Sequence, residues 1–272
     1  KDGRVYMSPR ITIDATFGDS GDTDNKAYDT EIPRLLGAGV QAIVGAASSG
    51  VSLQFIDRVI AECVIHFSPA NTSAAFTLDA ALELDGTITY IGGAGIDTVT
   101  GGAKNDTIDG KAGADVITGG KGVDSLTGGS GADSFKFTNA DQSNSGGADT
   151  IVDYVTGTDK IVITLDLSAK TSAQTVDATI NTAAAGTAAI QSGLSGSIGQ
   201  ATYDTTNSQL VVNANADNLV TTVDYVVNVG AVATAANSIV EGDINYVITG
   251  GTGADTIVAG SGADTIVTSG GG

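Results

Sequence analysis

Residues 92–136 consist of nonapeptides that follow one another without interruption. Each nonapeptide has aspartate at its sixth position and a large apolar residue at its eighth position. A strict nine-residue period restricts the chain to a repetitive fold in which every repeat contributes one structural unit. The first array reads GGAGIDTVT, GGAKNDTID, GKAGADVIT, GGKGVDSLT and GGSGADSFK, and a second array, GGTGADTIV and AGSGADTIV, begins at Gly250.

The local chemistry of one nonapeptide predicts a half-turn followed by a short strand. Its last three residues are β-prone, and the residues before them are rich in glycine, which permits the left-handed backbone conformations of tight turns. Two nonapeptides then complete one turn of a flattened coil, in which strands of alternate repeats stack in parallel about 4.8 Å apart. The side chains at position eight point inward and form an apolar ladder. The array therefore predicts a parallel β-roll.

The aspartates and the glycine-rich turns together have the chemistry of a cation site. The turns direct carbonyl oxygens into the gap between successive coils, and a carboxylate from each coil completes a cage. A flexible cage of roughly six to eight oxygen ligands suits Ca²⁺ better than Zn²⁺ or Mg²⁺. The alternative is a set of solvated Gly-Asp turns without an ion, but stacked carboxylates would then repel one another. We therefore expect metal binding and folding to be coupled.

These nonapeptides resemble the RTX, or hemolysin-type, calcium-binding repeat of secreted and surface proteins of bacteria. The resemblance implies that each calcium ion lies between repeats two apart. The implied pairs are Asp97 with Asp115, Asp106 with Asp124, and Asp115 with Asp133, while Asp255 and Asp264 would begin a second stack. The implied glycine ligands are Gly93, Gly95, Gly102, Gly113, Gly120, Gly122, Gly129 and Gly131.

Two of the early repeats depart from the pattern. Lys104 and Asn105 replace a glycine and a small residue in the second repeat, and Lys111 replaces the second glycine of the third. Asp109 ends the second repeat, where a neutral residue is usual. We expect the sites of the first two turns to be looser than the site at residues 119–133.

Composition restricts the partners of the chain. Its formal net charge is −19 over 272 residues, which excludes nucleic-acid binding by its own field and suits a calcium-rich exterior, extracellular or at the bacterial cell surface. One cysteine, Cys63, excludes an intrachain disulfide framework, and the single histidine, His66, lies in an apolar run. The sequence contains no uninterrupted apolar stretch of about 18 residues, so we expect no transmembrane helix. The chain opens without a signal peptide and ends within a repeat, so we expect a fragment of a longer protein.

Residues 1–82 do not follow the nonapeptide pattern, and their sequence predicts a small α/β unit. Strand-like segments at residues 10–15, 40–46 and 64–67 alternate with helix-like segments at 25–36 and 51–62, which favours a parallel three-stranded sheet of β-α-β-α-β order. Residues 1–76 also resemble the first lobe of periplasmic solute-binding proteins of the branched-chain amino-acid type. That resemblance implies ligand contacts at Ser48, Ser49, Ala70 and Thr72. Since half a lobe lacks a second wall, we favour a packing role.

The remaining segments complete the expected organisation. Residues 83–136 form the calcium β-roll, 137–249 an all-β capping or sandwich-like domain, and 250–272 the start of a second roll. Asp149, Asp153 and Asp159 are candidate cation ligands, but surface turn aspartates are the commoner interpretation. Asn71 and Asn105 begin N-glycosylation sequons, so glycans are candidate partners.

The chain has no motif that predicts an enzyme. It contains no HExxH, GxSxG, P-loop or CxxC sequence, and its GxG strings do not open a helix. The favoured hypothesis is a calcium-dependent extracellular structural protein, a self-associating subunit of a surface layer, adhesin or fibre. The alternatives are the export and stability region of a larger secreted enzyme, and a solute-binding protein with a calcium-binding extension.

Overall fold

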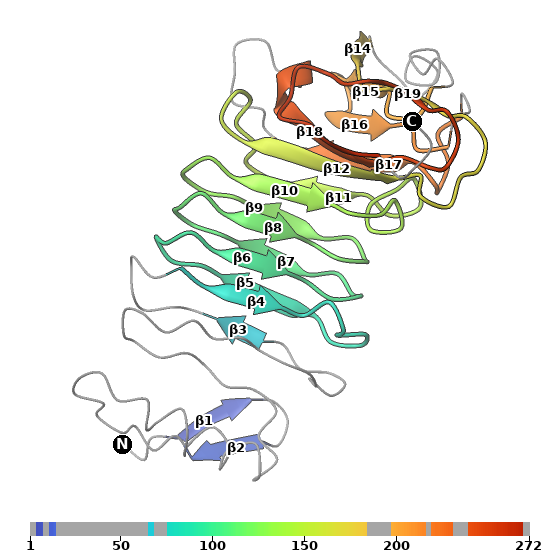
Figure 1. Cartoon of the computed structure of the whole chain (residues 1–272). Helices are drawn as coiled ribbons and strands as arrows, with labels where there is room; N and C mark the ends of the chain where they lie inside the picture. The colour runs from blue at the N-terminus through green and yellow to red at the C-terminus, as the bar shows by residue number, and fades with distance from the viewer. Residues whose placement is uncertain are drawn as a thin grey trace. The chain divides into compact units, whose positions relative to one another are not determined.

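The computed structural model of this chain describes residues 4–7, 11–14, 65–67, 75–183, 197–215, 219–230 and 239–268. The chain divides into two units between Ile43 and Val44. In the second unit the chain winds into a flattened coil, and successive half-turns contribute strands alternately to two stacked sheets (Figure 1). The predicted β-roll is confirmed.

The first sheet has seven strands, all paired in parallel. In spatial order they are β4 (Thr77–Asp79), β6 (Thr98–Thr100), β8 (Val116–Thr118), β10 (Ser134–Phe137), β12 (Lys160–Asp166), β18 (Ile244–Thr249) and β20 (Thr265–Val267).

The second sheet has nine strands and changes character along its length. Its parallel part is β3 (Ile65–Phe67), β5 (Ile88–Ile91), β7 (Thr107–Asp109), β9 (Ser125–Thr127), β11 (Asp149–Ile151) and β17 (Tyr225–Val229). Two antiparallel pairings follow, to β16 (Gln209–Val212) and β15 (Ala201–Asp204), before β14 (Ile180–Ala183) pairs in parallel.

The register of the coil follows from the nonapeptide period. Thr98 in β6 pairs with Val116 in β8, and Thr107 in β7 pairs with Ser125 in β9. Each pair is two nonapeptides apart, so equivalent positions of alternate repeats lie directly above one another. The glycine-rich turns consequently stack along the two edges of the coil.

The apolar ladder fills the space between the two sheets. The position-eight side chains are fully buried at 0% exposure: Val99, Ile108, Ile117, Leu126 and Phe135. Ile151 and Ile161 extend the same ladder beyond the array. Burial of one such side chain stabilises a fold by about 1.5–3 kcal/mol, so the ladder is the principal apolar core of the coil.

The coil continues past the boundary expected at residue 136. β11 and β12 join the two sheets of the roll in parallel, and the antiparallel strands β15 to β17 extend one of these sheets. The second array also adds to the same structure, because β20 pairs with β18. β19 (Thr256–Val258) pairs instead with β13 (Thr175–Asp177).

Two of the three strands expected in the N-terminal unit fall within the described residues. β2 (Ile11–Asp14) matches an expected strand, but it pairs antiparallel with β1 (Arg4–Met7), not in a parallel sheet. Few residues separate these two strands, so a local hairpin is favoured by loop closure. The expected strand at residues 64–67 is β3, and it pairs with β5 of the roll. The expected strand at 40–46, the expected helices and Ser48, Ser49, Ala70 and Thr72 lie outside the described residues.

Two further observations concern helical structure. A short 3₁₀ helix, η2 (Glu241–Asp243), leads directly into β18. Within the ranges that the structure describes, no helix has the length and apolar character needed to cross a membrane.

Candidate metal centre

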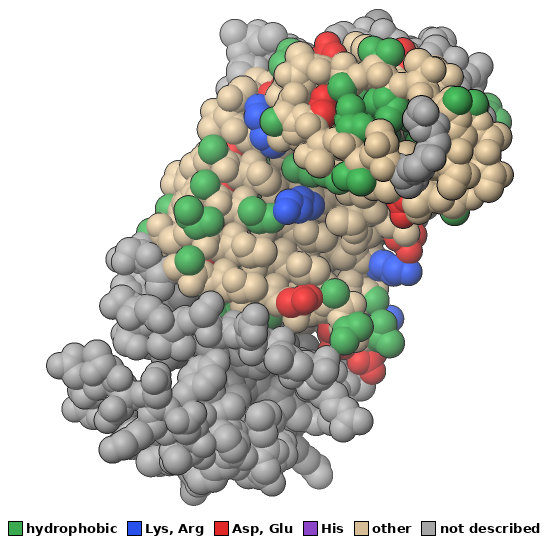
Figure 2. Space-filling view, in the orientation of Figure 1, with side chains coloured by type: hydrophobic (Ala, Val, Ile, Leu, Met, Phe, Trp, Pro, Cys, Tyr) green, Lys and Arg blue, Asp and Glu red, His purple; other side chains and the backbone are tan. Residues whose placement is uncertain are grey.

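The position-six aspartates stand immediately before the short strands, where the turns enter the sheets. They are almost completely buried, with exposed fractions of 0% for Asp97, 2% for Asp106, 0% for Asp115, 2% for Asp124 and 1% for Asp133. The face of the coil in Figure 2 accordingly shows mostly backbone and small polar side chains, with few acidic side chains. Much of the negative charge in the array is therefore inside the fold.

One oxygen of each aspartate connects two coils. In the third to fifth repeats Oδ1 accepts a hydrogen bond from the backbone N–H of the aspartate two repeats earlier, while Oδ1 of Asp97 and Asp106 accepts the N–H of Phe76 and Ile88. The N–H of Asp97 donates to Asp115 at 2.7 Å, that of Asp106 to Asp124 at 2.8 Å, and that of Asp115 to Asp133 at 2.8 Å. The structure thus brings together all three pairs that the sequence predicts.

The second oxygen divides the aspartates into two groups. In the first two repeats Oδ2 accepts an N–H from its own turn, from Gly93 to Asp97 at 3.3 Å and from Gly102 to Asp106 at 2.7 Å. In the next three repeats Oδ2 is buried without a hydrogen-bond partner, at Asp115, Asp124 and Asp133. A buried carboxylate oxygen without a donor is energetically expensive, so a positive partner would stabilise these three turns.

The backbone at position two differs between the same two groups. It has a left-handed φ in the third to fifth repeats, at 74° for Lys111, 99° for Gly120 and 95° for Gly129. Lys111 therefore occupies a conformation that favours glycine, which is a local strain in the third repeat. Its ammonium lies 2.7 Å from the carboxylate of Asp109 at the surface. Lys111 and Asp109, which both depart from the repeat pattern, therefore form an ion pair outside the core.

Carbonyl oxygens of one coil face the glycines of the next coil on the same edge. A Cβ atom at Gly113 would overlap the carbonyl oxygen of Gly95, and one at Gly131 would overlap that of Gly113. On the other edge, Gly120 and Gly122 approach the carbonyls of Gly102 and Lys104 in the same way. Gly129 lies against the carbonyl of Lys111. Glycine is therefore required by this close approach of stacked backbones.

Burial makes the carboxylates hard to ionise without a cation. It raises the pKa of Asp115 to about 6 and that of Asp124 to about 7, and the neighbouring aspartates on the same edge add repulsion. Burial also raises the pKa values of Asp97, Asp106 and Asp133, against the hydrogen bonds that lower them. A divalent cation would counteract these shifts, because a nearby positive charge favours the ionised carboxylate.

The residues present fit a hard cation with oxygen ligands. In the described part of the chain, no three or more His, Cys, Asp or Glu side chains form a cluster able to hold a metal. Each cage must therefore combine one or two carboxylates with backbone carbonyls, and this donor set is typical of Ca²⁺. The fit is best where Oδ2 has no donor, in the third to fifth repeats.

The two aspartates of the second array do not form one stack. Asp264 accepts the N–H of Tyr246 at 2.8 Å, while Asp255 accepts the N–H of Gln174 at 2.9 Å. Oδ2 of Asp255 accepts the N–H of Gly251 at 2.8 Å, whereas Oδ2 of Asp264 has no partner. Their neighbours come from segments that do not match the nonapeptide pattern, so the sequence alone did not indicate these contacts.

Two aspartates outside the arrays occupy the same structural position. Asp149 and Asp159 have exposed fractions of 0% and 2%, so their interpretation as surface turn residues is wrong. The N–H of Asp124 donates to Asp149 at 2.9 Å, and the N–H of Asp133 donates to Asp159 at 3.0 Å. Asp153 is less buried and accepts the N–H groups of Gly128 and Gly129. An IV dipeptide soon after Asp149 and Asp159 was the available sequence signal.

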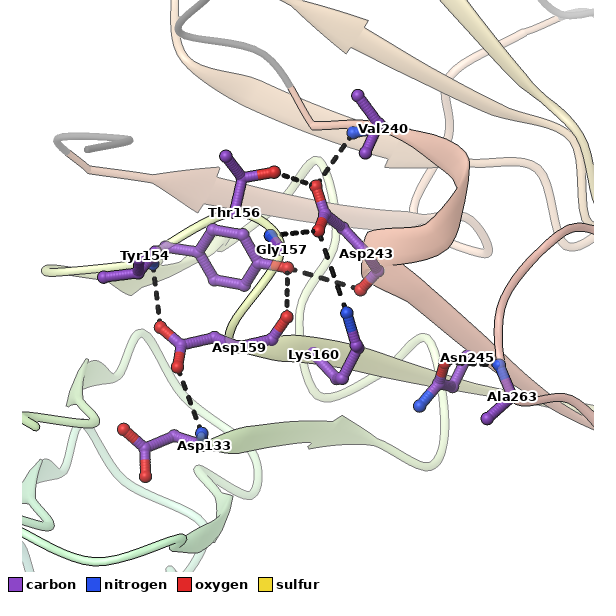
Figure 3. Close-up of polar contacts among 11 residues, drawn as sticks. Asp133, Tyr154, Thr156, Gly157, Asp159, Lys160, Val240, Asp243, Asn245 and Ala263 are labelled. Carbon is purple, nitrogen blue, oxygen red and sulfur yellow. Dashed lines mark hydrogen bonds and ion pairs between the residues drawn. The ribbon is translucent and has the colours of Figure 1, made fainter. Parts of the chain in front are cut away.

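A group of polar contacts closes the coil beside Asp159 (Figure 3). The buried carboxylate of Asp243 accepts the N–H of Gly157 at 2.7 Å and lies 3.9 Å from the ammonium of Lys160. It also accepts the hydroxyl of Thr156 and the N–H of Val240. These contacts join the turn before β12 to η2, and every partner of the Asp243 carboxylate named here is a protein group.

Replacing Asp115 by alanine should weaken calcium binding more than replacing Asp97. Oδ2 of Asp115 has no donor and is available to a cation, whereas both oxygens of Asp97 already accept backbone N–H groups. We expect Asp115→Ala to lower the apparent calcium affinity at least about tenfold more than Asp97→Ala. Isothermal titration of both variants measures this difference, and equal affinities and stoichiometries would contradict the pairing of coils.

Comparison with protein families supports calcium as the ion that the repeats bind. The family model of the RTX calcium-binding nonapeptide repeat, in four copies, matches residues 91–126, 100–135 and 247–272. The prediction of calcium as the bound ion is confirmed by this match. The resemblance of residues 1–76 to a solute-binding lobe gained no such support and stays a prediction. No curated protein matches the chain.

Proposed function

Because this chain carries RTX calcium-binding nonapeptide repeats, we propose that it is a calcium-dependent extracellular structural protein, with no enzymatic activity of its own. Its role would be that of a self-associating subunit of a surface layer, adhesin or fibre. One observation carries the proposal: buried aspartate oxygens on both edges of the coil have no hydrogen-bond partner and need a cation. Folding is then controlled by calcium, which is abundant outside cells.

Secretion is supported by the type of repeat. RTX repeat proteins are typically secreted, and cages that combine few carboxylates with many carbonyls suit the weaker, millimolar-range affinities of extracellular calcium modules. Inside a cell such sites would remain largely empty, and the stacked carboxylates would oppose folding. The chain would therefore reach its full stability only in a calcium-rich medium.

Self-association is supported by the second array. The position-eight side chain of its last repeat, Ile266, is 44% exposed, and Val267 beside it is 51% exposed. Both lie on β20, at the edge of the seven-stranded sheet. An unpaired strand edge with exposed apolar side chains favours addition of further strands, including those of a second copy.

Calcium-dependent assembly can be tested with two optical measurements on one sample. We expect calcium to increase the β-sheet signal in circular dichroism and, at higher protein concentration, light scattering, and we expect excess EGTA to reverse both. A gain in circular dichroism without scattering would retain calcium-dependent folding and reject the assembly role. No gain in either signal would reject the proposed function altogether.

A further inference from the structure

The turn at residues 144–149 lies outside the matched repeats but has their backbone arrangement. Thr150 pairs with Ser125 and Ile151 with Leu126, as position seven pairs with seven and eight with eight elsewhere in the coil. The N–H of Thr150 donates to the carbonyl of Asp124 at 2.8 Å, as the N–H of Ser125 does to Asp106 at 2.9 Å. Asp149 therefore stands at position six, although residues 137–143 interrupt the period.

The carboxylate of Asp149 lacks a positive partner. Its Oδ1 accepts the N–H of Asp124 at 2.9 Å, but its Oδ2 is buried with no hydrogen-bond partner. Oδ2 of Asp124, one coil away, is also buried without a hydrogen-bond partner. The exposed fraction is 0% for Asp149 and 2% for Asp124. Two unpartnered carboxylate oxygens in adjacent turns are not a stable arrangement in a low-dielectric interior.

A backbone carbonyl of the Asp124 turn faces the turn of Asp149. The carbonyl of Gly122 lies 3.8 Å from the position that a Cβ at Gly147 would occupy, so position four of one turn faces position four of the other. This is the same stacking as in the arrays, with more space. Carboxylate and carbonyl oxygens together are the donors of a hard divalent cation.

We propose that Asp124 and Asp149 hold a further calcium ion, in a site that extends the row of Asp106 and Asp124 beyond the matched repeats. The inference requires calcium binding by the coil but not its assembly into a layer or fibre. It assigns Asp149 as a ligand through Oδ2, with Gly122 as a candidate carbonyl donor.

This site lies where the parallel part of the nine-stranded sheet meets its antiparallel part. Asp149 pairs with Val227 of β17, and its N–H donates to the hydroxyl of Ser143 at 2.8 Å. The hydroxyl of Ser143 in turn donates to the carbonyl of Val226. Calcium at Asp149 therefore stabilises the junction between the coil and the antiparallel strands, in addition to the coil itself.

Asp159 provides the matched comparison on the opposite edge. It is also buried at position six and accepts the N–H of the preceding aspartate, Asp133. Its Oδ2, however, accepts the N–H of Val155 at 2.7 Å. Because both oxygens of Asp159 have protein donors, this turn does not need a cation.

The test counts bound calcium by equilibrium dialysis at saturating calcium in the wild type, Asp149→Asn and Asp159→Asn. We expect Asp149→Asn to bind one ion fewer per chain and Asp159→Asn to bind as many ions as the wild type. An unchanged count in Asp149→Asn, or an equal loss in both variants, would overturn the proposal. Circular dichroism at saturating calcium verifies that each variant is folded before its ions are counted.

A measurement on the wild type keeps the test independent of any variant. The ¹³C signal of the Asp149 side-chain carboxyl should shift on addition of calcium, while that of Asp159 should follow only the folding of the coil. In the same titration, calcium should slow hydrogen exchange of the backbone amides in β17. If the Asp149 signal is the same in the folded protein with calcium and in the protein at the lowest calcium that still folds the array, the site does not exist.

Discussion

The calcium-free protein should be more stable at pH 5 than at pH 8. Burial raises the pKa of Asp149 to about 8 and that of Asp124 to about 7, from an ordinary value of 3.8. A group whose pKa is higher in the folded state contributes stability at low pH, and this contribution is lost as pH rises through the folded pKa. Each pKa unit corresponds to about 1.4 kcal/mol per group. We expect the free energy of unfolding to fall by about 6 kcal/mol between these pH values, summed over the two groups.

Calcium should reverse this dependence. Binding requires ionised carboxylates, so it displaces protons, and the calcium-loaded protein should be more stable at pH 8 than at pH 5. Urea unfolding followed by circular dichroism gives both profiles, with protein stripped of calcium by a chelating resin because EGTA binds calcium poorly in acid. Parallel profiles with and without calcium would show that these aspartates are not its ligands.

Replacing Gly131 by alanine should remove most of the stability of the coil. Gly131 has a φ of 142°, and a Cβ there would overlap the carbonyl oxygen of Gly113 in the neighbouring coil. Backbone strain and overpacking each cost about 1–3 kcal/mol, so we expect a loss of about 4 kcal/mol in urea unfolding at saturating calcium. The carbonyl of Gly113 would also be displaced, which should weaken the calcium site between these turns.

Gly157 is the control for this substitution. It also has a left-handed φ, 78°, and it occupies the equivalent position in the turn before Asp159, but a Cβ there would meet no heavy atom within 4 Å. Gly157→Ala should therefore lose only the backbone term of about 1–2 kcal/mol and no calcium affinity. If both variants lose the same stability, backbone conformation and not the stacking of coils determines the requirement for glycine.

The sequence predicted the coil because the offset between paired strands is a whole number of repeats, two nonapeptides. Val99 and Ile117 lie on one another since they are two nonapeptides apart, and the same spacing brings Asp97 to Asp115. Which turns leave an aspartate oxygen without a donor could not be predicted, because this depends on whether the backbone N–H at position two donates to Oδ2. The N–H of Gly102 donates to Asp106, whereas Oδ2 of Asp124 has no donor although Gly120 occupies the same position.

The rest of the coil could not be predicted because its turns differ in length from the nonapeptide. Residues 137–143 separate Asp149 from the array, and no period leads from one to the other. The second array pairs through β18, whose position-six residue is Tyr246 and not aspartate, so its place in the same sheet depends on long-range packing. A nine-residue pattern describes contacts between its own copies and has no information about such interrupted turns.

The spacing of the coils also determines how the molecule responds to mechanical load. Since β6 is held to β8 at a register of Thr98 with Val116, tension along the stacking direction reaches one turn at a time and detaches it as a unit. Each detached turn would lengthen the chain by about 60 Å, from the extended length per residue. We therefore expect the array to extend in steps of equal length but unequal force, with the highest force at turns where an aspartate oxygen has no protein donor and a cation would bridge the coils.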